Sequence, residues 1–351
     1  MEDFFDRHSK ALLEFSWMSN DIGSRADDVQ GGGGNTSVKL DGGLMAIKAS
    51  GYHLGDVKPQ NGYAVLDGAA LRDFYERHEA ADFDDVEQSG AARAKELTLQ
   101  VEGLPALRPS VEAGFHSLLD TFVAHSHSVY GNLAACCDQA ERVTTEALQG
   151  APYSYALIPY VNPGAMLTFQ IRDALRRVKA ETGRTPAVLL MRSHGLIAHA
   201  DTAEECLALH EDASRRFMAH FGVSRADFPL PQIRNAEGGF VSDTPWLKDR
   251  LRGQAHPDSA LLGEPLYPDQ LVFFEGTLGS KAKIDRETGL THYDLPERSA
   301  LTFEQTLCAV VFIRETLARH GLHPVSMGEA AREFISGWES EKYRKTLGQG
   351  G

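Results

Sequence analysis

The chain has 351 residues, 42% of them hydrophobic and 24% charged, which is typical of a globular protein with one large domain or two moderate ones. No run approaches the roughly 18 apolar residues that a membrane span needs, and this excludes a transmembrane role. The net charge of −14 and the lack of a basic stripe argue against a nucleic-acid binder. A small phosphorylated ligand remains compatible with this charge, because backbone N–H groups and a few local donors can hold it.

The amino terminus and the cysteines predict a cytoplasmic protein. The opening MEDFFDRHSKALLEFSW begins with acidic residues and lacks the basic, apolar and small-residue segments of a secretory signal. The four cysteines form neither a CxxC pair nor a regular framework, which is typical of reduced thiols. We assign them no chemistry.

Apolar periodicity and turn residues predict alternating strands and helices over the first two thirds of the chain. In order, we expect a helix over 4–18, strands over 36–40, 44–49 and 63–67, and a helix over 69–78. A polar and mostly solvated segment over 79–96 follows, then a helix over 108–120 with Ser110 as its N-cap, a strand over 122–127 and a helix over 129–137. Beyond these we expect a strand over 155–161, a helix over 165–181, two buried strands over 187–200 with a turn at His194 and Gly195, and a helix to about 221 opened by the capping box Thr202 to Glu205. This alternation indicates one α/β domain over residues 1–225.

A second, smaller unit is expected over residues 226–351. The segment 225–246 is rich in Pro, Gly and Asp, so we interpret it as a linker. Beyond it the pattern predicts a strand at DQLVFF (269–274), a hairpin over 283–294, and helices over 303–319 and 327–346. We therefore expect an α+β extension.

Two histidines one residue apart, His125 and His127, lie in the predicted strand FVAHSH. Residues i and i+2 of a strand project from the same face, so the two imidazoles would lie within chelating reach of one ion. From the spacing by itself, a chance pair of histidines is the favoured interpretation.

A third histidine, His194, stands where an apolar strand meets a glycine turn in MRSHGLIAH. Catalytic zinc usually has three protein ligands and one open position, so His194 could complete the set. His199 and His210 are rivals for this place. His199 falls at a strand end, and His210 shares a helical face with apolar residues, which favours a role in the core or behind the ligands.

Glu112, in PSVEAGFHSLL, is the candidate acid/base, because lyase chemistry needs a positioned proton carrier besides a Lewis acid. The alternative is a surface glutamate favoured in the first turn of a helix. Asp120 is a weaker rival, since it precedes a strand and could act only as a cap.

The glycine run GGGGNTS, residues 31–37, allows positive φ angles and close backbone approach, so its N–H groups could surround an anion. It lacks the GK[ST] ending of a P-loop and the following helix of a dinucleotide fingerprint. A flexible loop is the alternative.

Four pieces in order, GGGGNTSVK, KASG, PSVE followed by HSH, and SHGLIA, resemble the class II aldolase/adducin family over residues 10 to 222. This family includes zinc-dependent fuculose- and rhamnulose-phosphate aldolases and ribulose-phosphate 4-epimerases. The tail FISGWESEKYRKTL and the short acid-to-HxH spacing further resemble the aldolase portion of long rhamnulose-phosphate aldolases that are elsewhere fused to a dehydrogenase. The dehydrogenase portion is expected to be absent here.

The resemblance implies an α/β fold with a central, mainly antiparallel sheet flanked by helices, and a homotetramer with sites near subunit interfaces. It implies that His125, His127 and His194 bind zinc, with manganese or cobalt as alternatives, and that Glu112 is the acid/base. It places the phosphate contacts at Gly34, Asn35, Ser50, Gly51 and Ser110.

The implied reaction is the reversible aldol cleavage of a ketose 1-phosphate, similar to rhamnulose 1-phosphate, into glycerone phosphate and an aldehyde. A 4-epimerase of this family typically has aspartate where Glu112 stands, so the glutamate favours the aldolase. A dehydratase that enolises a sugar phosphate over a metal is a further alternative. A non-catalytic, adducin-like interaction domain is another, and the intact histidines and Glu112 count against it.

Overall fold

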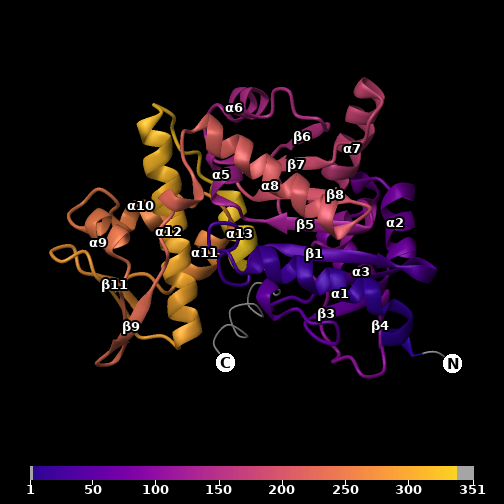
Figure 1. Ribbon diagram of the computed structural model, residues 1–351, viewed down its shortest axis with the longest axis horizontal. Helices are drawn as coiled ribbons and strands as arrows, with labels where there is room; N and C mark the ends of the chain where they lie inside the picture. The colour runs from indigo at the N-terminus through magenta and orange to yellow at the C-terminus, as the bar shows by residue number, and fades with distance from the viewer. Residues whose placement is uncertain (1–2, 338–351) are drawn as a thin grey trace.

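A central eight-stranded sheet organises the part of the chain between Asn35 and Ala200 (Figure 1). The structure is a computed structural model that describes residues 3–337. The strand order is β4-β3-β2-β1-β5-β8-β7-β6, and every neighbouring pair is antiparallel except β6 and β7. The strands are β1 (Asn35–Leu40), β2 (Leu44–Lys48), β3 (Tyr63–Asp67), β4 (Thr98–Leu99), β5 (Phe122–Ser126), β6 (Tyr155–Ile158), β7 (Val188–Met191) and β8 (Gly195–Ala200).

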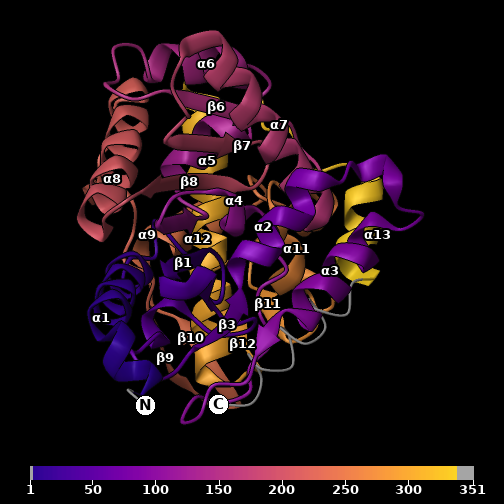
Figure 2. The ribbon, with the colours of Figure 1, turned by 90° about the vertical axis from the view of Figure 1, so that its right-hand side faces the viewer.

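Helices cover both faces of this sheet, with α1 and α8 on one side and α2, α3 and α7 on the other (Figure 2). The helices are α1 (Phe4–Gly23), α2 (Gly68–Arg77), α3 (Val86–Glu96), α4 (Ala113–Leu118), α5 (Val129–Ala135), α6 (Ala140–Ala147), α7 (Ala165–Thr182) and α8 (Ala203–His220). Short 3-10 turns lie at Asp41–Gly43, Leu54–Asp56, Ala80–Asp82 and Arg225–Asp227. The expected α/β fold with a central, mainly antiparallel sheet is confirmed.

The central strands are buried on both faces because helices pack on each side of them. Every residue of β5 is buried, and so is every residue of β8. On α1, the side chains of Leu12, Phe15, Met18 and Ile22 recur at helical spacing and pack on the sheet. The three strands β1, β5 and β8 therefore form a fixed frame at the centre of the molecule.

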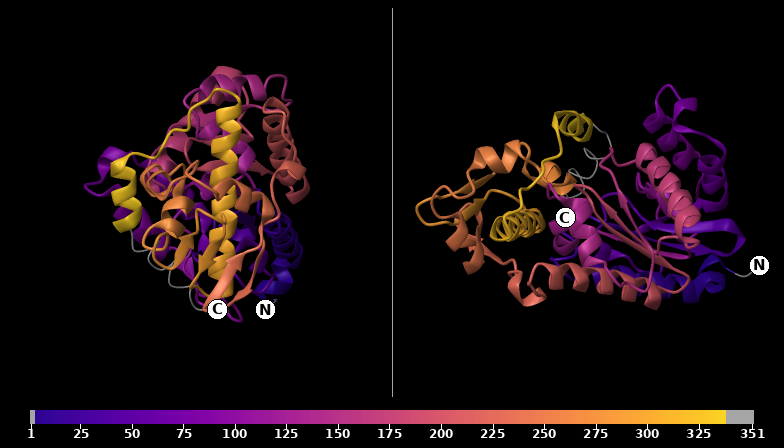
Figure 3. Two further views of the ribbon diagram at one scale, coloured as in Figure 1. Left: turned by 90° about the vertical axis from the view of Figure 1, so that its left-hand side faces the viewer. Right: turned by 90° about the horizontal axis from the view of Figure 1, so that it is seen from above.

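The C-terminal part contains a smaller sheet of four strands in the order β11-β12-β10-β9. Its strands are β9 (Ile233–Ala236), β10 (Gly239–Ser242), β11 (Ala282–Ile284) and β12 (Thr291–Tyr293). Its helices are α9 (Pro245–Leu251), α10 (Asp258–Gly263), α11 (Pro268–Phe274), α12 (Glu297–Arg319) and α13 (Glu329–Gly337). Figure 3 shows α12 as a long yellow helix in this part.

The C-terminal part shares a hydrophobic core with the first 225 residues. Apolar side chains of α12, such as Val310 and Phe312, belong to the same buried cluster as Val129 and Leu133 of α5. The helix α12 also packs on α11. The two parts therefore bury apolar surface against each other. The division into residues 1–225 and 226–351 is a proposal about which part carries the catalytic function. None of the helices within residues 3–337 has the length and apolar character that crossing a membrane requires.

Several predicted elements differ from the observed ones. The segment DQLVFF, predicted as a strand, forms α11, because Pro268 occupies the first helical turn and a short apolar run is equally compatible with a buried helix. The predicted linker 225–246 contains the hairpin of β9 and β10. Within the mostly exposed segment 79–96, α3 forms and buries Gly90 and Ala94.

The predicted helix 108–120 begins later than expected. It spans Ala113–Leu118, its N-cap is Glu112, and Ser110 instead accepts a hydrogen bond from the Glu112 N–H at 3.2 Å. Helices α6, α9 and α10 were not predicted. Of the predicted helix 327–346, the described part is α13, and the remainder lies outside the described residues, as does most of the tail FISGWESEKYRKTL.

Candidate functional site

Three histidines converge at the carboxyl end of β5. His125 is in the strand, His127 follows its last residue, and His194 precedes β8. The ring centroids lie 5.0 Å apart for His125 and His127, 4.9 Å for His125 and His194, and 5.2 Å for His127 and His194. Among the described residues 3–337, one nitrogen from each comes within 4.8 Å of the others, and all three side chains are buried. The structure thus brings the three predicted candidate ligands together.

The sheet explains why residues far apart in sequence meet here. β5 pairs with β8 so that His125 lies opposite Ile197, and the tight turn before β8 directs His194 back toward β5. Ser193 in that turn has a φ of 49°, a left-handed conformation unusual for a residue with a side chain. Gly195 is required, because a Cβ there would lie 2.2 Å from the Ser126 carbonyl oxygen.

Hydrogen bonds at Nδ1 set the free nitrogen of two of these histidines. Nδ1 of His125 lies 3.1 Å from the Leu196 carbonyl oxygen, which can only accept, so Nδ1 carries the proton and Nε2 carries the lone pair. Within residues 3–337, this Nε2 is buried without a hydrogen-bond partner. Nδ1 of His127 lies 2.5 Å from Oδ2 of Asp269. Both rings therefore offer Nε2 to the space between them.

Glu112 joins the histidines from the N-cap of α4. Its Oε1 lies 3.4 Å from Nε2 of His125 and 3.3 Å from Nε2 of His194, and its side chain is 10% exposed. Burial raises the pKa of Glu112, but the electrostatic effect of the neighbouring His125 and His194 outweighs burial and holds the pKa well below its usual range. Burial lowers the pKa of His194 to about 4, which keeps this imidazole neutral near pH 7.

The residues present fit a divalent transition-metal ion. Three imidazoles and one carboxylate are a donor set that binds zinc and related ions. The orphaned Nε2 of His125 is the observation that favours an ion, because a buried polar atom without a partner is costly. Such an ion would remove this cost.

The alternative candidates, His199, His210 and Asp120, form hydrogen bonds away from the histidine cluster. His199 uses both ring nitrogens, with Nδ1 2.8 Å from Asp120 Oδ2 and Nε2 2.8 Å from the Pro186 carbonyl oxygen. Asp120 is therefore paired away from the cluster. His210 places its Nε2 2.6 Å from the hydroxyl of Ser126 and lies behind the strand, as expected for a residue of the core.

A pocket of about 520 Å³, open to solvent, lies directly against the cluster. It is lined by all five predicted phosphate contacts together with three of the four candidate metal-centre residues: Gly34, Asn35, Ser50, Gly51, Ser110, Glu112, His127 and His194. The Ser50 N–H donates to the Arg108 carbonyl oxygen at 3.0 Å, and Ala49 bridges to Pro109, which brings the segment KASG beside PSVE.

Asn35 and Lys48 give this pocket its polar character. The Oδ1 atom of Asn35 is buried and has no hydrogen-bond partner within the described part of the chain. Lys48, also in the pocket, is 3% exposed and donates from Nζ to the carbonyl oxygens of Tyr52 at 2.7 Å and Gly32 at 3.1 Å. A buried cation beside backbone N–H groups suits an anionic ligand.

Sequence reasoning did not single out two residues of this site. Lys48 is the first residue of the motif KASG, so a lysine at a strand end beside the glycine loop was a usable signal. Asp269 had no such signal, because its segment was predicted as a strand far from the cluster. Its contact with His127 joins residues 142 positions apart.

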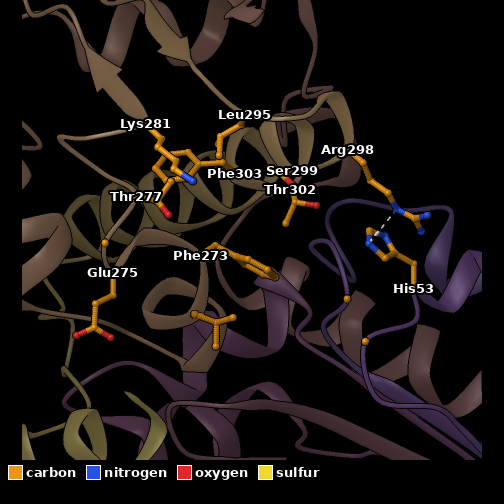
Figure 4. A pocket seen from close by; sticks show the side chains of 14 residues that line it. His53, Phe273, Glu275, Thr277, Lys281, Leu295, Arg298, Ser299, Thr302 and Phe303 are labelled. Carbon is orange, nitrogen blue, oxygen red and sulfur yellow. Dashed lines mark hydrogen bonds between the residues drawn. The ribbon is translucent and has the colours of Figure 1, made fainter. Parts of the chain in front are cut away.

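A second, larger cavity of about 890 Å³, open to solvent, lies beside the glycine loop (Figure 4). It shares Gly32 and Gly51 with the smaller pocket, and Phe273 and Thr302 from the C-terminal part line it. Arg298 at its edge donates to His53 Nε2 at 3.2 Å. Among the described residues, its lining contains none of the three histidines and not Glu112, so the chemistry is expected in the smaller pocket.

Residues 22–220, more than half of the chain, match the family described as the class II aldolase and adducin N-terminal domain. The uncharacterized oxidoreductase YuxG of Bacillus subtilis is 28% identical over 248 residues, which are 65% of this chain and 33% of that protein. The chain thus spans about a third of the length of this curated relative.

Two solved structures are also similar to part of the chain. The N-terminal class II aldolase domain of a conserved protein from Thermoplasma acidophilum is 22% identical, with a TM-score of 0.48 over 62% of this chain and 94% of that one. The L-fuculose-1-phosphate aldolase from Thermus thermophilus is 16% identical, with a TM-score of 0.37 over 60% of this chain and 93% of that one.

Proposed function

The chain belongs to the class II aldolase and adducin family, and from this membership we propose that it is a metal-dependent lyase. The proposed reaction is the reversible cleavage of a ketose 1-phosphate, similar to rhamnulose 1-phosphate, into glycerone phosphate and an aldehyde. The observation that carries the proposal is the position of Glu112, whose carboxylate contacts His125 and His194 and lines a polar pocket.

The histidines would hold the ion, with zinc proposed as the native one, since neutral imidazoles suit it. A divalent ion bound there would supply Lewis-acid stabilisation of the negative charge that develops on the substrate oxygens. The adducin-like alternative, a domain without metal, is disfavoured by the burial of these imidazoles around an unpaired Nε2.

Glu112 would carry the proton. In the cleavage direction the bond between C3 and C4 breaks, the C4 hydroxyl loses its proton to become the aldehyde, and C3 takes up a proton to become the hydroxymethyl group of glycerone phosphate. In condensation the ionised Glu112 removes that proton from C3, and its lowered pKa favours this starting state.

The phosphate group would lie in the pocket against Asn35, Ser50, Gly51 and Ser110. Backbone N–H groups at Gly34 and the charged Lys48 would complete its contacts. Because the group is held at one end, the reacting carbons are oriented toward Glu112. This arrangement supports a phosphorylated substrate over a free sugar.

We further propose that residues 1–225 form the catalytic unit and that residues 226–351 are an extension that covers one side of it. A homotetramer in the cytoplasm is proposed from the resemblance and the cysteine pattern. The interpretation of the chain as the aldolase portion of a longer type of rhamnulose-phosphate aldolase belongs to the same proposal.

The test is a coupled assay for glycerone phosphate release from rhamnulose, fuculose and xylulose 1-phosphates. We expect release from at least one, dependent on added zinc, manganese or cobalt. Epimerised or dehydrated product without glycerone phosphate would support one of the other reactions of the fold. Less than a tenth of an equivalent of bound metal, with no activity on zinc addition, would support the non-catalytic interaction domain.

A further inference from the structure

A carboxylate from the C-terminal part lies behind one of the candidate metal ligands. Oδ2 of Asp269, in the first turn of α11, is 2.5 Å from Nδ1 of His127. The two side chains are 0% and 4% exposed, so the contact lies within the core. A hydrogen bond at Nδ1 leaves Nε2 of His127 facing the other two histidines as a donor for an ion.

The start of α11 is fixed by contacts on several sides. The Tyr267 hydroxyl donates to Gln30 Oε1 at 3.1 Å, which ties this segment to the loop before the glycine run. Inside the turn, the Leu266 N–H donates to Gln270 Oε1 at 2.9 Å. The apolar side of α11 packs against α13. Asp269 is therefore held in one place by the packing around it.

The glycine loop makes room for this pair. A Cβ at Gly33 would lie 2.3 Å from Oδ2 of Asp269 and 2.8 Å from Nδ1 of His127, distances that no side chain tolerates. The φ angle of Gly33 is outside the left-handed region, so space and not backbone conformation requires glycine here. The loop therefore has a second use besides the anion pocket.

An acidic residue in the first turn of a helix is common, because it interacts favourably with the helix dipole. That explanation does not account for burial of the carboxylate against an imidazole 142 residues earlier in the chain. Carboxylates that accept the second N–H of a ligating histidine fix its tautomer and orientation and raise its basicity, and their loss typically lowers metal affinity about 10- to 100-fold.

We propose that Asp269 is a positioning residue that orients His127 for metal binding, so that the C-terminal part completes the metal centre of the first 225 residues. The inference rests on the proposed metal-dependent function. His125 differs from His127, because a backbone carbonyl and not a carboxylate accepts its Nδ1 hydrogen bond. Of these two histidines, only His127 therefore has a negatively charged group behind it.

The experiment measures zinc affinity of the full chain by competition with a chelator, with no substrate present. The variants are Asp269→Ala, which removes the acceptor, and Asp269→Asn, which keeps the shape and loses the charge. Asp249→Asn is the matched control, because Asp249 is an exposed aspartate of α9 in the same part of the chain. Visible absorption of the cobalt-loaded proteins reports the ligand geometry independently of activity.

We expect the zinc dissociation constant to rise about 10- to 100-fold in Asp269→Ala and less in Asp269→Asn, with an altered cobalt spectrum and no change in Asp249→Asn. Gly33→Ala should weaken zinc binding too, since its Cβ displaces the carboxylate. Zinc affinity within threefold of the parent in folded Asp269→Ala and Gly33→Ala would overturn the inference, and so would a parent that binds no divalent metal. Tight zinc binding without glycerone phosphate release would instead overturn only the proposed reaction.

Discussion

Oε1 of Glu112 lies 3.3 Å from Nε2 of His194, so the candidate proton carrier and a candidate metal ligand are in direct contact. Their positions come from two different elements, the N-cap of α4 and the turn before β8. A substrate that binds between them would have to displace the carboxylate from the histidine. Proton transfer is assigned to Glu112 and metal binding to the three histidines, so mutations of these residues can test the two roles separately.

Glu112→Gln is expected to keep the metal and lose turnover by about 10²- to 10⁴-fold, the usual contribution of a positioned acid or base. The amide preserves the shape of the side chain and removes the transferable proton. Steady-state rates with metal content measured on the same sample check this. Asp120→Asn is the control, because Asp120 pairs with His199 outside the pocket. Turnover of Glu112→Gln within a few fold of the parent would contradict the assignment.

His127→Ala is expected to release the metal, because it removes one of three buried imidazoles. His199→Ala should retain the metal, since both nitrogens of His199 are bonded elsewhere. Elemental analysis after dialysis against a weak chelator compares the two. A normal metal content in folded His127→Ala, or equal losses in both variants, would exclude the cluster as the binding site.

Lys48→Met is expected to raise the KM for a phosphorylated ketose by about tenfold or more, as loss of one charge-assisted hydrogen bond does. Lys48 is buried in the pocket, while Lys58 is exposed on a neighbouring loop and provides the matched Lys58→Met control. Inorganic phosphate should inhibit the parent competitively and the Lys48 variant much less. Equal inhibition of both proteins would place the phosphate elsewhere.

The protein is expected to lose stability as the pH falls from about 6.5, in part through His210. Burial lowers the pKa of His210 to about 3 from its ordinary value of 6.5, so the folded state stays neutral where the unfolded state takes up a proton. Above pH 6.5 His210 does not reduce the free energy of unfolding. Between pH 6.5 and pH 3 the free energy of unfolding falls by up to about 1.4 kcal/mol per pH unit for this one proton.

Urea unfolding of metal-free protein between about pH 7.5 and 5 measures this slope. His210→Gln should show a shallower decline than the parent, whatever its absolute stability. His292→Gln, at an exposed position, serves as the control. A slope unchanged by His210→Gln would show that this residue is not the buried neutral histidine that the structure places behind β5.

Much of the fold could be predicted from short-range patterns. The strand at 63–67 and the capped helix after Thr202 were expected with nearly their observed bounds, because alternation and capping residues are local signals. The prediction for DQLVFF was wrong for the same reason, since a short, largely apolar run fits a buried strand and a buried helix equally. Pro268 at its start favours the helix, and the packing of this helix against α12 and α13 stabilises it.

The sequence by itself indicated the candidate side chains of the proposed site, because HSH, Glu112 and the glycine run each lie in a short local motif. The tertiary structure decided which histidine completes the cluster, since His199 and His210 are excluded only by partners 79 and 84 residues away. It also decided that Asp269 stands behind His127. Such contacts depend on how distant elements pack, and no local pattern of residues encodes that packing.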